Sequence, residues 1–163
     1  MKQDVLSVLP EYNVRKVENA LDASSLPAQL LRDFLVARRW FRSKARILRD
    51  AKLRELIPLP HVDSAIGLMD LTYAEGDQDT YVLTLALARG PEAGSLEQEY
   101  PKAAVARVIS DDGEHALLYD AVWNPIFCRE LLRAIGGNKD YVSAESGRFS
   151  GRSTHAFATI SGG

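Results

Sequence analysis

Short apolar runs paired around polar turns constrain the fold of this chain more than any other feature. The first pair is Ile66–Tyr73 and Tyr81–Leu87, separated by Glu75–Asp79. The glycine and the acidic residues of this separating segment suit a chain reversal and pair poorly in a sheet. Within the second run, Tyr81, Leu83, Leu85 and Leu87 fall on one face, as expected of a half-buried strand. The pattern predicts an antiparallel hairpin.

A second hairpin is predicted from the same type of pattern further along the chain. Its runs are Val105–Ile109 and His115–Val122. The Asp112-Gly113 pair between them offers the backbone a position of positive φ, which hairpin turns require. Before both hairpins, alternating apolar residues over Ile47–Ile57 predict a partly exposed strand that Pro58-Leu59-Pro60 ends.

Helical spacing of apolar residues marks three further elements. One helix has Pro27 in its first turn and runs to about Arg39. Another follows the cap-like pair Asn124-Pro125 and ends at Gly136-Gly137. A short helix is predicted over Val14–Leu21. The apolar stripes of the two longer helices are Leu30, Leu31, Phe34 and Leu35, and Phe127, Leu131, Ala134 and Ile135.

Helices first, antiparallel strands next and a closing helix predict an α+β fold in which a curved antiparallel β-meander, from about Ile47 to Val122, packs against the helices. Three segments stand apart. Arg89–Pro101 holds glycines, prolines and glutamates and is predicted to be an exposed, mobile loop. Tyr141–Phe149 is predicted to be a loop, and Thr154–Ile160 a strand.

Charge is nearly balanced over the whole chain, with 20 basic and 22 acidic residues, so it gives no argument for a nucleic-acid or membrane partner. Locally it is uneven, because residues 32–54 hold nine basic residues and only two acidic ones. We expect intramolecular pairing with acidic groups elsewhere to neutralise most of this excess.

The cellular compartment is inferred from absences. The single cysteine, Cys128, cannot form an intrachain disulfide. Residues Met1–Asp4 do not open a signal peptide, and no apolar run approaches the ~18 residues of a membrane span. We therefore expect a cytoplasmic protein without a membrane partner.

Residues that could carry chemistry are few. No glycine-rich phosphate loop is present, and Gly136-Gly137 follows a helix instead of opening one. His61, His115 and His155 lack the spacing of a metal site. The remaining candidates have simpler interpretations: Cys128 as a small apolar residue near a helix start, and the pairs Asp77/Asp79 and Asp111/Asp112 as turn formers. We assign no catalytic, cofactor-binding or metal-binding residue.

The most informative stretch is Arg39-Trp40-Phe41-Arg42-Ser43-Lys44-Ala45-Arg46, here called the signature segment. Aromatic residues interleaved with bases are one way in which proteins bind single-stranded nucleic acid. The alternative is a structural clasp at a helix exit. From the register of Leu30, Phe34 and Ala37 we predict that Trp40 and Phe41 are core anchors, and that the bases serve acidic surfaces of a larger protein.

The signature segment resembles the arginine-tryptophan-phenylalanine, lysine and arginine motif near the start of maltokinases. The similarity continues through Ile57-Pro58-Leu59, Asp79–Ala86 and Leu118–Ala121, and on to Ala158. Thr84 departs from it, because the family often has proline there. The residues that we assign to this structural signature are Arg39, Trp40, Phe41, Lys44, Arg46, Tyr81 and Asp120.

The resemblance implies that residues 1–137 form a non-catalytic N-terminal cap domain and that residues 138–163 are a linker and the first strand of the next kinase subdomain. In the complete enzyme it implies ATP and Mg²⁺ as cofactors and maltose as the acceptor, with maltose 1-phosphate as the product for α-glucan synthesis. The implied partners are the remaining kinase lobes and a trehalose synthase, either fused or separate. A different class of function stays open: an independent module that binds a small molecule on the concave face of the sheet, or single-stranded nucleic acid.

Overall fold

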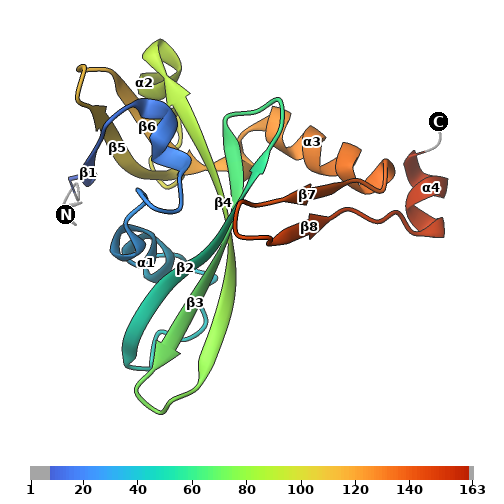
Figure 1. Cartoon of the computed structure of the whole chain (residues 1–163), viewed down its shortest axis with the longest axis horizontal. Coiled ribbons are helices and arrows are strands. Elements are labelled where there is room, and N and C mark those ends of the chain that lie inside the picture. The colour runs from blue at the N-terminus through green and yellow to red at the C-terminus, as the bar shows by residue number, and fades with distance from the viewer. Residues whose placement is uncertain (1–7, 162–163) are drawn as a thin grey trace, which may run out of the picture.

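A six-stranded sheet that curls around helix α1 is the frame of the molecule (Figure 1). The computed structural model describes residues 8–161, except for the side chains of Ala158 and Ser161. The expectation about Met1–Asp4 lies outside these residues. The strands are β1 (Glu11–Val14), β2 (Leu48–Leu59), β3 (Ser64–Tyr73), β4 (Gln78–Arg89), β5 (Ala104–Ser110), β6 (His115–Asp120), β7 (Asp140–Val142) and β8 (Arg148–Ser150). The helices are η1 (3₁₀, Val17–Leu21), α1 (Ala28–Val36), α2 (Gly90–Glu99), η2 (3₁₀, Ala121–Trp123), α3 (Pro125–Gly136) and α4 (His155–Ser161).

The α+β class and both hairpins are confirmed. Strands β2, β3 and β4 pair antiparallel in succession, as do β5 and β6. Gly76 and Gly113 stand in the two turns with φ of 91° and 84°, where a side chain would strain the backbone. The turn chemistry therefore places these strands correctly from sequence.

The strand order departs from a simple meander. The order across the sheet is β1-β5-β6-β4-β3-β2, so β6 lies between β4 and β5. Because β6 runs antiparallel to both neighbours, β4 and β5 are parallel, and the chain crosses between them through α2. Parallel strands require such a crossover, which a two-residue turn cannot supply.

Both faces of the sheet are covered. The first core lies beneath η1 and α1 and includes Leu31 and Leu35, both fully buried, packed against Leu83, Leu85 and Leu118. The second core lies on the other face beneath α3, where Phe127 is fully buried against Ala86, Leu117 and Tyr119. The predicted face of Tyr81, Leu83, Leu85 and Leu87 turns to the first core.

The β2–β3–β4 end of the sheet projects from the body as an arm (Figure 1). Strand β4 pairs with β3 over Gln78–Ala86 but with β6 only over Leu85–Arg89. The first half of β4 therefore has β3 as its one described neighbour, and the arm ends at the turn that contains Gly76.

Helix α3 begins as predicted. The Asn124 side chain accepts hydrogen bonds from the backbone amides of Ile126 (2.8 Å) and Phe127 (3.4 Å), with Pro125 in the first turn. The helix ends at Gly136, and Gly137 is its cap. Helix α1 starts at Ala28, so Pro27 is its N-cap and not a residue of its first turn as predicted, and the helix ends at Val36, three residues earlier than expected.

The prediction of a mobile loop over Arg89–Pro101 is wrong, because residues 90–99 form α2. Gly90, at φ 55°, turns the chain out of β4, and Pro91 lies in the first helical turn, where proline is tolerated. The segment is nevertheless exposed, since α2 contains no buried residue.

Both ends of the described chain also differ from expectation. Within Val14–Leu21 only η1 is helical, and the unpredicted β1 precedes it, paired parallel to β5. Tyr141–Phe149 is not a plain loop, because it contributes to the β7–β8 hairpin. The strand predicted over Thr154–Ile160 is wrong, since α4 occupies His155–Ser161.

The β7–β8 hairpin packs against the sheet. Ser143 Oγ donates a hydrogen bond to Glu55 Oε2 at 2.5 Å, and a Cβ on Gly147 would meet the same Glu55 side chain, so a larger residue there would have to displace it. Tyr141 and Phe149 stack at 6.0 Å between ring centroids and adjoin the second core. The predicted domain boundary at residue 137 stays a prediction.

Candidate functional site

The signature segment connects α1 to β2 and divides into an inner and an outer half. Phe41 is buried, and Ser43 and Arg46 are half-buried. The other members, Arg39, Trp40, Arg42, Lys44 and Ala45, are exposed. Inner and outer residues are interspersed along the segment. It is irregular and not helical, so side chains of neighbouring residues point in different directions.

Phe41 and Trp40 both contact Tyr81 of β4, but only Phe41 is a core anchor. The ring centroids of Phe41 and Tyr81 are 5.3 Å apart, and those of Trp40 and Tyr81 are 6.2 Å apart. Phe41 is 4% exposed and Trp40 is 48% exposed, so the prediction is confirmed for Phe41 and wrong for Trp40. The cause is the early end of α1 at Val36, which breaks the helical register that would have pointed Trp40 inward.

Arg46 joins the signature segment to the turn at the end of the arm. Its guanidinium lies 3.0 Å from Asp77, 3.6 Å from Glu75 and 4.0 Å from Asp79, and 3.8 Å above the centre of the Tyr73 ring. One exposed ion pair contributes roughly 0–1 kcal/mol, but several carboxylates and an aromatic face fix the position of this arginine more firmly.

Asp79 is the acceptor at the centre of this contact. Its Oδ2 accepts hydrogen bonds from the hydroxyls of Tyr73 (2.9 Å) and Ser43 (3.1 Å). Burial raises the pKa of Tyr73 to about 12, and Asp79 acts in the same direction, so the hydroxyl remains a donor at neutral pH. We call Ser43, Arg46, Tyr73 and Asp79 the clasp. Asp77 and Asp79 thus do more than form the predicted turn.

Asp120, at the end of β6, holds a second junction. Its Oδ1 accepts hydrogen bonds from Thr84 Oγ1 at 2.5 Å and from the amide of Val122 at 3.3 Å, which caps η2. Burial lowers the pKa of Arg38, and the nearby Asp120 carboxylate opposes that change. The charge of Asp120 therefore also acts on the arginine that follows α1. The hydroxyl of Thr84, the departure from the maltokinase pattern, thus supplies a contact that proline could not.

The remaining candidates are scattered. His61 lies in the β2–β3 turn, His115 opens β6 and His155 opens α4. Among residues 8–161 no group of three or more His, Cys, Asp or Glu side chains could hold a metal ion. The Cys128 thiol donates to the Val122 carbonyl at 3.4 Å, which is a structural contact. In the same part of the chain, no helix is both long and apolar enough to cross a bilayer.

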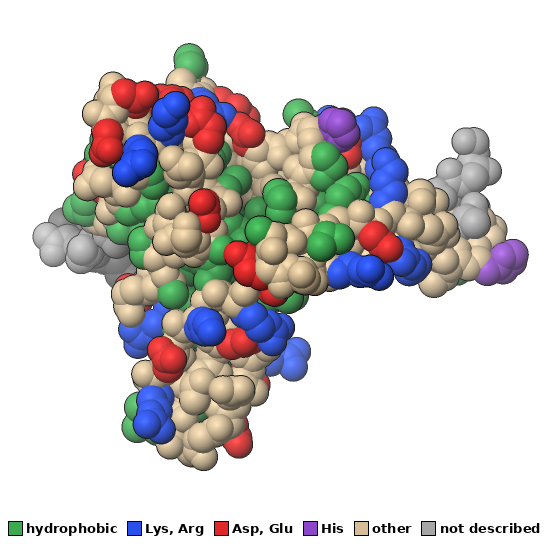
Figure 2. All heavy atoms as spheres, viewed as in Figure 1, with side chains coloured by type: hydrophobic (Ala, Val, Ile, Leu, Met, Phe, Trp, Pro, Cys, Tyr) green, Lys and Arg blue, Asp and Glu red, His purple; other side chains and the backbone are tan. Residues whose placement is uncertain are grey.

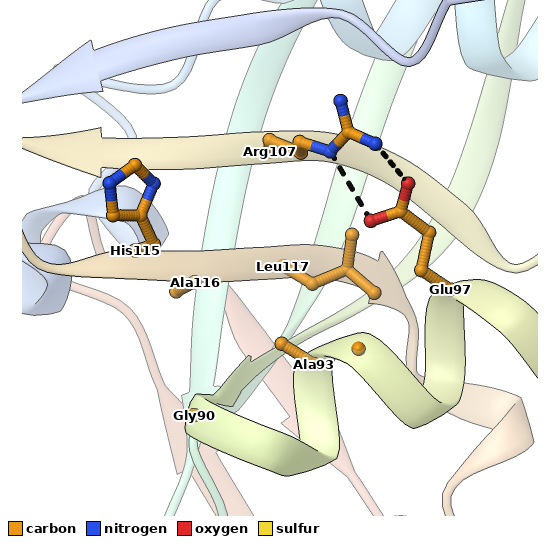
Figure 3. A pocket seen from close by; sticks show the side chains of 8 residues that line it. Gly90, Ala93, Glu97, Arg107, His115, Ala116 and Leu117 are labelled. Carbon is orange, nitrogen blue, oxygen red and sulfur yellow. Dashed lines mark hydrogen bonds and ion pairs between the residues drawn. The ribbon is translucent and has the colours of Figure 1, made fainter.

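Two hollows could admit a small molecule. One, of about 290 Å³, lies between α2 and the β5–β6 hairpin, and Figure 3 shows Ala93, Ala116 and Leu117 along it with His115 at one end. At its other end Glu97 accepts both hydrogen bonds from Arg107, so these charges satisfy each other.

The second hollow, of about 720 Å³, lies beside the β2–β3 turn. Asp63 and Arg89, at its lining, form an ion pair with each other. Ser64 Oγ has no partner among the described residues, but it is closed to solvent and therefore out of a ligand's reach. In each hollow the arginine of the lining is paired with a carboxylate, Arg107 with Glu97 and Arg89 with Asp63.

A curled sheet with a core on each face, whose arm is held at its end by the clasp, defines a small α+β domain. Residues 34–123 match the family model of the maltokinase N-terminal cap domain, which covers more than half of the chain. The chain belongs to this family. The match includes the signature segment, the clasp and Asp120, and it confirms the cap assignment made from sequence.

Proposed function

We propose that this chain is the non-catalytic N-terminal cap of a maltokinase, whose complete form transfers the γ-phosphoryl group of ATP to maltose to give maltose 1-phosphate and ADP. The family match over residues 34–123 carries the proposal. The proposed location is the cytoplasm. The proposed partners are the kinase lobes of the same polypeptide and a trehalose synthase, either fused or separate.

The residues of this chain do not fit the ATP and Mg²⁺ that the complete enzyme would use. A phosphate site needs backbone amides at a glycine-rich helix start, together with a lysine or arginine, and Mg²⁺ needs free carboxylates. Helix α3 starts at Asn124-Pro125, and the Asn124 side chain already accepts from its first amides. At the clasp, Asp77 and Asp79 face Arg46. We therefore propose that ATP and Mg²⁺ bind outside this chain, and we derive no catalytic step for it.

The cap would serve the enzyme through rigid positioning. The clasp holds the end of the arm against the segment that follows α1. At the other end of the arm, where β4 begins to pair with β6, Asp120 of β6 accepts a hydrogen bond from Thr84 of β4. A cap held at two junctions keeps its surfaces in a constant relation to each other, which is what a packing or hinge element requires.

The test compares three proteins: the complete polypeptide, the same polypeptide without residues 1–137, and the 163-residue chain alone. Each is incubated with ATP, Mg²⁺ and maltose, and maltose 1-phosphate is followed by phosphorus NMR. We expect product from the complete polypeptide and none from the isolated chain. A complete polypeptide that phosphorylates no maltose would refute the proposal. So would turnover by the isolated chain that is lost on mutating a residue within it.

A further inference from the structure

The outer half of the signature segment is not explained by the fold. Arg39, Arg42 and Lys44 are exposed, and none of the three has an ion pair or hydrogen bond with the residues that the structure describes. Trp40 stands among them with 48% of its surface exposed, and one side of its indole rests on Tyr81. A large aromatic side chain and three unpaired cations therefore share one short stretch of surface.

This arrangement contrasts with other bases of the same basic stretch. Arg46 faces three carboxylates, and Arg54 pairs with Asp70 at 3.3 Å. The expected intramolecular neutralisation thus occurs only in part, because among the described residues it leaves out Arg49 and Lys52 of β2 as well as the bases that flank Trp40. Figure 2 shows basic and acidic side chains together on the upper part of the arm, and many acidic ones with some basic ones over the end of the molecule formed by β5, β6 and α2.

We propose that Arg39, Trp40, Arg42 and Lys44 form a docking surface for a protein partner that presents carboxylates around an apolar recess. Tryptophan and arginine are the side chains that most often dominate binding energy at protein interfaces, where a ring of polar contacts surrounds an apolar anchor. Five peptide steps separate Arg39 from Lys44, at most about 19 Å at full extension, which fits within one interface of ordinary size. The carboxylates supply the charge complementarity that the three cations lack among residues 8–161.

The same geometry disfavours single-stranded nucleic acid as the ligand. Non-specific binders of single strands stack successive bases on several aromatic side chains along a basic groove. Here Phe41 is buried, so Trp40 is the one aromatic of the signature segment that a base could reach. The chain as a whole carries a net charge of -2, which does not attract a polyphosphate from a distance. A local cluster of carboxylates suits a local cluster of cations better.

The proposal is tested with a fluorescein-labelled peptide of glutamates with interspersed leucines, titrated with the 163-residue chain and followed by anisotropy. We expect saturable binding that weakens with added salt and falls at least tenfold in Trp40→Ala. The matched control is Trp123→Ala, because Trp123 is 46% exposed and also rests on one tyrosine, Tyr100. This control should bind the peptide as the unaltered chain does.

Two triple variants distinguish the effect of the position of the positive charges on binding from the effect of the net charge of the chain. Arg39→Glu/Arg42→Glu/Lys44→Glu should abolish binding. Arg15→Glu/Arg129→Glu/Lys139→Glu changes the net charge equally at exposed positions elsewhere and should retain binding to within a few-fold.

Three results would overturn the proposal: no saturable binding of the peptide, equal loss in both triple variants, or tighter binding of a uridine oligonucleotide of the same total charge. Because none of these readouts uses phosphoryl transfer, the docking surface can fail while the proposed kinase parentage stands, and the reverse.

Discussion

Replacing the two neighbouring aromatics of the signature segment should have unequal effects on stability. Phe41→Ala removes a ring that is 4% exposed and packed on Tyr81 at 5.3 Å, so it leaves a cavity in the first core. Truncation of a buried phenylalanine costs about 3–5 kcal/mol. Trp40→Ala removes a ring that is 48% exposed and leaves no closed cavity, so we expect a cost of about 2 kcal/mol or less.

Thermal unfolding followed by circular dichroism measures this difference. In a domain of this size each 1 kcal/mol shifts Tm by roughly 2–4 °C, so Phe41→Ala should lower Tm by about 6–20 °C and Trp40→Ala by about 8 °C or less. Trp123→Ala, which removes an equally exposed indole, is the control and should resemble Trp40→Ala. A Trp40→Ala variant at least as unstable as Phe41→Ala would refute the division of the signature segment into an inner and an outer half.

Three further predictions concern other parts of the fold. Asn124→Ala should lower the free energy of unfolding by about 1 kcal/mol in urea titrations, because it removes the acceptor at the start of α3, whereas Asn13→Ala in β1 removes no cap and should cost less. Backbone amides of α2 should exchange with deuterium faster than those of α3, since α2 buries no side chain; equal protection would contradict this. Hydrogen bonds from Ser24, Ser110 and Ser150 lower the pKa of Asp22, Asp112 and Asp140, so their contribution to stability is present above about pH 4 and is lost as pH falls through the lowered values. Alanine at Ser110 and Ser150 should flatten the acid limb of the stability profile, whereas Ser24→Ala keeps the backbone amide that lowers the pKa of Asp22 most and should change that limb less.

The parts of the fold that could be predicted from sequence are those with local causes. Apolar residues alternate in β4 because Tyr81, Leu83, Leu85 and Leu87 face the first core, and the glycines at 76 and 113 indicate turns that need positive φ. The Asn124-Pro125 pair likewise places a helix start through bonds to the next residues of the chain. Each signal acts within a few residues of its effect.

Sequence reasoning failed where the cause lies far along the chain or where one signal has two outcomes. Strand β1 forms because it pairs with β5, for example Glu11 with Arg107, 96 residues later, and the sequence around Val14 and Val17 contains no local sign of that pairing. Gly90-Pro91 can open a loop or a helix, and the closing of the β4–β5 crossover decides for the helix. Within the clasp, Asp79 was assigned to the turn because its partners, Ser43 and Arg46, belong to a segment more than thirty residues earlier.

The exposure of Trp40 bears on how the whole signature segment is understood. Stability accounts for Phe41, Ser43 and Arg46, because each is held by the core or by the clasp. Exposing half of an indole to water gains the fold little, and placing unpaired cations on both sides of it gains less, since like charges repel. These outer residues would instead contribute to the free energy of binding a partner. The segment that resembles the maltokinase motif thus combines two separable tasks. Substitutions on its inner half should lower the melting temperature without weakening docking, whereas those on its outer half should weaken docking with a smaller loss of melting temperature.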